Sequence, residues 1–199
     1  MALPDGLPLS ARCDYYCGWY HVHPRVHGGP VRNHPPGNLA VERELFRECG
    51  GFDVRHPIAF SHEELRWQAE LERRGNRIYF EPSMRTDHWN RPGWRNLHRR
   101  NYRWGYGAVE IKSETGIVRW PFLYRRPALL IAASLFLAPL QAVYIITSWL
   151  RAGVFEPALI SPAILSARFA YSLGMAIGGI RWLRRRDSRE ELRVRPRWE

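Results

Sequence analysis

Two stretches in the first half of the chain decide the expected fold: GNLAVERELFRECGGFD at residues 37–53 and EELRWQAELERRGNRIYFEP at residues 63–82. The first predicts a helix that a pair of glycines ends near residue 50. The second predicts a helix over residues 63–74, then a short strand at Ile78–Phe80 that a proline closes.

The second stretch opens with two adjacent carboxylates, Glu63 and Glu64. In the first turn of a helix the macrodipole favours negative charge, so an ordinary solvated helix start is one interpretation. A carboxylate held at a helix start is also a suitable general base, which gives the pair a second, catalytic interpretation.

Together, the two stretches resemble the acceptor-side half of family 2 glycosyltransferases of the GT-A type. In those enzymes a Glu-Asp pair is followed by a glycine about eleven residues later and by a short strand that ends in proline. Here Glu63 and Glu64 form the pair, Gly75 follows at the matching distance and Pro82 closes the strand. The resemblance implies that Glu64 is the general base of an inverting sugar transfer and that Glu63 lies beside the sugar. Glutamate in place of aspartate moves the carboxylate by about one methylene.

Three further residues take roles from the same resemblance. Gly37 and Asn38 match a Gly-Asn element that lines the substrate side, although Asn38 is equally suited to cap the helix that runs to about residue 49. His88 lies six residues after Pro82, where many relatives carry a histidine. The resemblance implies Mg²⁺ or Mn²⁺ as cofactor and makes His88 a candidate ligand.

A basic, aromatic segment follows, in which a helix is expected over residues 94–108. The run Arg100-Asn-Tyr-Arg103-Trp104 resembles the Gln-x-x-Arg-Trp motif of processive polysaccharide synthases, which implies substrate-binding roles for its two arginines and the tryptophan. Arginine replaces the glutamine at position 100, which argues against a processive synthase. A cationic helix at a membrane surface is the alternative.

The composition indicates an anionic partner. The chain has 199 residues, a formal net charge of +11 and a pI near 10.3, which suits phosphate-bearing substrates, anionic lipids or nucleic acid. No nucleic-acid-binding motif accompanies the charge, so nucleic acid is not expected. Three cysteines favour a reducing, cytosol-facing location. Cys13 and Cys17, with His21 and His23, have zinc-ligand types, but their spacing fits no common site closely.

After Pro121 the chain becomes strongly apolar. The 24 residues 127–150 carry no charge and would reach roughly 36 Å as one helix, enough to span a bilayer with a kink at Pro139. A second apolar stretch, residues 157–180, contains one arginine, so a second span and a helix lying in the interface are both open. Its small residues recur every four positions and predict close helix packing: Ser166, Ala170, Gly174 and Gly178. Arginines outside both stretches place the outer ends in the cytoplasm, at the inner membrane.

We therefore expect four segments: an irregular segment at 1–36 with a short strand near residues 15–22, a partial glycosyltransferase-like domain at 37–120, a membrane segment at 121–186 and a charged tail at 187–199. The fold class expected is α/β, partially GT-A-like, followed by one or two transmembrane helices. The sequence has no Asp-x-Asp motif, and the first segment is too short for a nucleotide-binding half. The chain is then either a truncated gene product or a subunit that needs a separate chain to supply that half, and alone it would be inactive. The alternative is an inactive basic membrane scaffold derived from such an enzyme.

Overall fold

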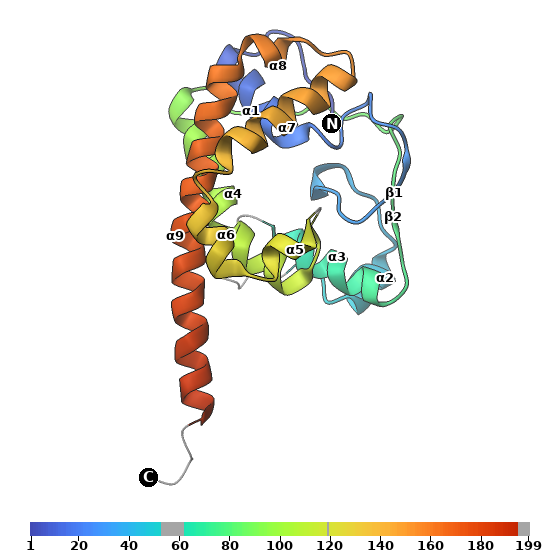
Figure 1. Cartoon of the computed structure of the whole chain (residues 1–199). Helices are drawn as coiled ribbons and strands as arrows, with labels where there is room; N and C mark the ends of the chain where they lie inside the picture. Colours follow the sequence, from blue (N-terminus) through green and yellow to red (C-terminus); the bar gives the residue numbers. More distant parts are fainter. Residues whose placement is uncertain (53–61, 119, 195–199) are drawn as a thin grey trace.

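The computed structural model describes residues 1–52, 62–118 and 120–194, with side chains to residue 186. Its elements follow in chain order: α1 (Leu9–Trp19), β1 (Gly29–Val31), the 3-10 turn η1 (Pro36–Asn38), α2 (Arg43–Glu48), α3 (Glu63–Arg73), β2 (Ile78–Phe80), α4 (Trp94–Thr115), α5 (Pro121–Tyr124), α6 (Pro127–Ala133), α7 (Ala138–Arg151), α8 (Glu156–Leu159) and α9 (Ser161–Val194). Figure 1 shows α9 running along one edge of the molecule and continuing alone past the other elements.

The described chain is mostly helical, so the expected α/β character is confined to one small sheet. β1 and β2 pair antiparallel, with Gly29 opposite Phe80 and Val31 opposite Ile78. The strand expected near residues 15–22 is wrong, because most of that segment belongs to α1. Residues on nearly all sides of α1 are buried, so its sequence shows no amphipathic period that would have revealed a helix.

Residues 37–53 and 63–82 form most of the helices and strands predicted for them. α3 and β2 are confirmed, and Gly75 follows α3 with a φ of 80°, a left-handed conformation that favours glycine. The cap predicted for the preceding helix is wrong: α2 begins at Arg43 after Glu42, and Asn38 lies in η1. The Asn38 amide instead donates a hydrogen bond to the carbonyl of Met84, at 2.8 Å.

α4 and α9 lie against each other over most of the length of α4 and run in the same direction. Three glycines permit this contact, because a Cβ atom at Gly105, Gly174 or Gly178 would lie only 1.8–2.1 Å from a carbonyl oxygen of the facing helix. The close packing predicted for the small-residue face is thus confirmed at Gly174 and Gly178. Its partner is α4, which extends to Thr115, beyond the predicted end at residue 108.

The span predicted over residues 127–150, with a kink at Pro139, is divided into two helices. α6 and α7 meet at an angle of 85°, and the break over residues 134–137 comes just before Pro139, which lies in the first turn of α7. Proline is tolerated there because the first N–H groups of a helix have no partner within it. In the described part of the chain, one continuous segment, Ser161–Arg186 in α9, is long and apolar enough to cross a membrane.

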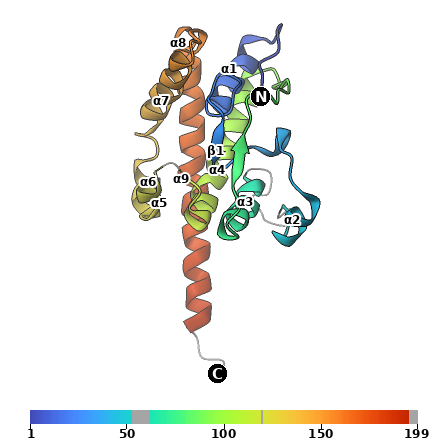
Figure 2. The same cartoon turned by 90° about the vertical axis from the view of Figure 1, so that its right-hand side faces the viewer.

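Two layers flank α9. Figure 2 shows α5, α6, α7 and α8 on one side of α9 and α1, α3, α4 and the sheet on the other. A core cluster joins α1 to α7 and α9 through residues such as Tyr16, Trp149 and Ile164. A second cluster joins α4 and α6 to α9. The segments on either side of residue 121 therefore share their cores.

Candidate functional site

The carboxylate pair stands where the sequence predicts, in the first turn of α3. One face of this helix is buried through Leu65, Trp67 and Leu71. Gln68, also buried, accepts a hydrogen bond from the amide N–H of His34 at 3.2 Å and donates one to the His34 carbonyl at 2.6 Å. These contacts fix the rotation of α3, so the half-buried Glu63 and Glu64 have defined positions.

Glu64 has an unusual carboxyl group. Its pKa is raised to about 7, mainly by burial and also by the neighbouring charge of Glu63, while its own backbone N–H and Lys112 act in the opposite direction. A carboxylate with a pKa near neutral pH can accept a proton and release it under the same conditions. This carboxyl is therefore the best candidate for a general base among the residues that the sequence singled out.

The raised pKa predicts a specific effect on stability. Unfolded Glu64 ionises near pH 4.5 and folded Glu64 near pH 7, so between these values the folded protein binds more protons and its stability falls as pH rises. We expect Glu64→Gln to raise the free energy of unfolding by about 2 kcal/mol at pH 8 and to leave it nearly unchanged at pH 4. Urea denaturation at both pH values measures this. Glu63→Gln is the control and should keep most of the wild-type pH dependence, because burial is the main cause of the shift.

One basic side chain near Glu64, that of Lys112, was not predicted. His21, just after α1, is in electrostatic range of Lys112 and His34, and burial lowers its pKa to about 4, so it is neutral at pH 7. Lys112, on α4, donates a hydrogen bond to the hydroxyl of Tyr171 at 3.3 Å. No local motif marks Lys112, because the fold brings α4 against α3 from a distant part of the sequence.

A second polar cluster gathers three of the predicted residues: His88, Arg100 and Trp104. Its centre is Asp14 of α1, which is 2% exposed. The carboxylate of Asp14 accepts hydrogen bonds from Arg100 at 2.5 Å and from the amide of Asn90 at 2.6 Å. Nδ1 of His88 lies 2.7 Å from Oδ1 of Asn90. The guanidinium of Arg100 lies over the ring of Trp104, 4.3 Å from its centroid.

These contacts do not fit a metal site at His88. Its Nδ1 already faces Asn90, and its ring packs against Trp19 with 4.6 Å between centroids. Asp14, which carries the cluster's carboxylate, is engaged by Arg100 and Asn90. Within residues 1–52, 62–118 and 120–186, no group of three His, Cys, Asp or Glu side chains is arranged to hold a metal ion, and this includes Cys13, Cys17, His21 and His23. The arrangement of these residues therefore does not fit a Mg²⁺ or Mn²⁺ site.

The remaining predicted residues lie apart from both clusters. Gly37 is exposed in η1, where an added Cβ would lie 2.7 Å from the terminal methyl of Met1. Arg103 is exposed on α4. Arg100 and Trp104, both named for substrate binding, contact each other within the second cluster.

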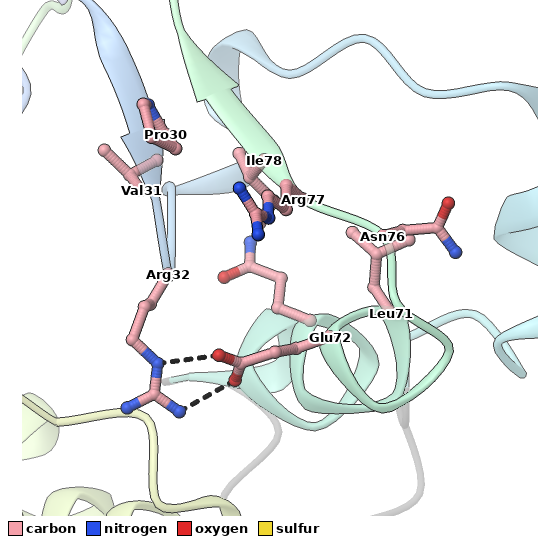
Figure 3. A pocket seen from close by; sticks show the side chains of 9 residues that line it. Pro30, Val31, Arg32, Leu71, Glu72, Asn76, Arg77 and Ile78 are labelled. Atoms are coloured by element: carbon pink, nitrogen blue, oxygen red, sulfur yellow. Dashed lines mark hydrogen bonds and ion pairs between the residues drawn. The ribbon is translucent and has the colours of Figure 1, made fainter.

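A shallow groove of about 200 Å³ lies beside α3 and the sheet (Figure 3). Arg32 and Glu72 form one side of it and are joined by two hydrogen bonds of 2.9 and 2.7 Å, while Val31, Leu71 and Ile78 supply apolar lining. Glu64 is not among its lining residues. The groove therefore does not mark the site of the carboxylate pair.

Comparisons of the chain with family models, with curated proteins and with solved structures give no match.

Proposed function

We propose that this chain is the acceptor-side, membrane-associated part of a family 2-type glycosyltransferase and that Glu64 is its general base. One observation carries the proposal: a half-buried carboxylate in the first turn of α3 has a pKa near 7. The order of helix, Gly75, strand and Pro82 that follows is the order that the sequence resemblance requires.

In the proposed reaction Glu64 takes the proton of an acceptor hydroxyl. The hydroxyl oxygen forms a bond to the anomeric carbon of the donor sugar, and the bond from that carbon to the nucleotide diphosphate breaks, with inversion. The leaving diphosphate keeps the electron pair of the broken bond. A separate chain would hold the nucleotide and the Mg²⁺ or Mn²⁺ ion. The acceptor would be a glycan or a lipid-linked glycan at the cytoplasmic face of the inner membrane.

Reconstituted membranes test this proposal. Membranes from source cells that lack the chain are supplemented with wild-type, Glu64→Gln or Glu64→Asp protein and incubated with a panel of radiolabelled UDP- and GDP-sugars. Wild-type protein should restore label transfer to the glycan or lipid fraction. Glu64→Gln should lower it at least a hundredfold, as expected for loss of a general base, and Glu64→Asp should retain part of it. Equal transfer by wild-type and Glu64→Gln protein would contradict the proposal.

The same assay gives an expected pH dependence. A base works only when ionised, so transfer should rise about tenfold per pH unit well below pH 7 and level off above it. The profile is measured from pH 5 to pH 9. A rate that stays flat across pH 6–8 would show that a group other than Glu64 controls the chemical step.

A non-enzymatic membrane scaffold is the second candidate. The observation that favours it is that Arg100, a predicted substrate-binding residue, is engaged with Asp14 and with Trp104, which was predicted for the same role. A scaffold would restore transfer equally well with glutamate or glutamine at position 64. The reconstitution assay therefore separates the two candidates.

A further inference from the structure

The surroundings of α9 conflict with a helix that crosses a bilayer. α4 runs beside the apolar part of α9: His98 lies 3.0 Å from the hydroxyl of Ser166, and Gly174 and Gly178 face backbone atoms of Tyr102 and Tyr106. Three exposed arginines of α4 lie in its N-terminal half, at the level of this apolar stretch: Arg95, Arg99 and Arg103. A spanning α9 would carry their guanidinium groups into hydrocarbon, at about 3 kcal/mol each on insertion scales.

The layer on the other side of α9 exposes large apolar side chains. Phe136 is 82% exposed, Leu159 81% and Phe155 70%, and Leu129 and Leu140 are each more than 60% exposed. α9 adds an exposed stripe spaced by three or four residues, which consists of Phe169, Leu173, Ile177 and Ile180. Exposed apolar surface of this kind is typical of a partner or membrane contact.

The bend between α6 and α7 limits how this layer can meet a bilayer. At about 1.5 Å per residue, the 7 residues of α6 and the 14 residues of α7 reach roughly 10 and 21 Å. Neither helix crosses a hydrocarbon core of about 30 Å, and their 85° angle prevents them from adding to one straight span. Both helices can lie in the interface with their apolar side chains in the outer part of one leaflet.

The edges of this layer are basic. Arg125 and Arg126 are exposed just before α6, and Arg151 is exposed at the end of α7. Arginines beside an apolar surface can contact lipid phosphates while neighbouring phenylalanines and leucines enter the acyl region. This charge favours an anionic lipid surface over an apolar protein partner.

We propose that α6, α7, α8 and the exposed stripe of α9 form a docking face that enters one leaflet of an anionic bilayer without crossing it. α3, which carries Glu64, lies in the layer on the opposite side of α9 (Figure 2) and would remain on the aqueous side. The inference concerns how the chain sits on a membrane, and it stands independently of the proposed transfer activity.

Labelling of introduced cysteines from each side of the membrane tests the topology of the full chain in a bacterial expression host. Arg151→Cys reports on the connection between the two apolar stretches, and Glu81→Cys, exposed after β2, reports on the aqueous side. A membrane-impermeant maleimide is applied to spheroplasts and to inverted vesicles, with the parent chain, whose three cysteines are buried, as the background. Docking in one leaflet predicts that both positions label in inverted vesicles only. Labelling of Arg151→Cys from spheroplasts and of Glu81→Cys from inverted vesicles would establish a spanning hairpin and overturn the proposal.

Vesicle partition tests the face itself. The double variant Phe136→Glu/Leu159→Glu should lower binding of purified protein to phosphatidylcholine–phosphatidylglycerol vesicles about a hundredfold, because it removes two inserted side chains and adds charge. Tyr79→Glu is the matched control: this aromatic residue is 68% exposed on β2, and its replacement should leave binding unchanged. Circular dichroism verifies that each variant is folded. Unchanged binding by the double variant, or wild-type protein that forms dimers through this face and does not bind vesicles, would contradict the proposal.

Discussion

Replacing Asp14 with alanine is expected to lower the free energy of unfolding by about 4 kcal/mol, because breaking a buried ion pair leaves its partner charge uncompensated. Asp14 is buried and accepts hydrogen bonds from Arg100 and Asn90. Burial raises the pKa of Asp14 and lowers that of Arg100, while each of the two charges favours ionisation of the other. Urea denaturation in a non-denaturing detergent measures the loss.

A double-mutant cycle identifies the cause of this loss. Arg100→Met removes the guanidinium and retains an apolar stem over Trp104. If the uncompensated charge of Arg100 causes most of the destabilisation, the Asp14→Ala/Arg100→Met variant should recover at least about 1 kcal/mol relative to the sum of the single changes. Strict additivity would show that the Asp14–Arg100 contact contributes nothing specific.

The second large effect is expected at the contact between α4 and α9. Alanine favours a helix over glycine by about 1 kcal/mol, so Gly178→Ala would stabilise an isolated helix. In the folded chain, however, the added Cβ would lie 2.0 Å from the carbonyl oxygen of Tyr106, and the two helices must move apart. We expect a net loss of about 3 kcal/mol, near the upper end for overpacking.

Ile177→Ala is the control for this change, because Ile177 is the adjacent residue and is 44% exposed. Its replacement should alter the free energy of unfolding by less than about 1 kcal/mol. Thermal and urea unfolding of both variants are compared under the same conditions. A Gly178→Ala variant as stable as the parent chain would contradict the close approach of α4 and α9.

Local sequence signals predicted the part of the fold that they control directly. The carboxylates at the start of α3, Gly75 after its end and Pro82 after β2 act within a few residues, so their positions could be predicted. α1 could not be recognised, because burial on nearly all sides removes the amphipathic period. A kink at Pro139 could be predicted, but its size could not, since hydropathy is the same for a slightly kinked span and for one bent by 85°.

The residues of the candidate site likewise include some that a sequence motif marks and one that no motif marks. Glu64, His88, Arg100 and Trp104 stand in patterns that a sequence shows. Asp14 could not be predicted, because it pairs with Arg100 across 86 positions of the chain and belongs to no motif. The structure also changes the interpretation of Arg100, which the resemblance assigns to substrate and which here neutralises a buried carboxylate.

The ionisation of Glu64 tests the central claim most directly. The carboxyl carbon of Glu64 is followed by ¹³C NMR from pH 4 to pH 9, with the Glu64→Gln spectrum identifying its resonance. We expect a midpoint of about 7, a value set mainly by burial at the start of α3. A midpoint near 4.5, the ordinary value for a solvated glutamate, would make the pair a simple helix start and would contradict the assignment of Glu64 as the general base.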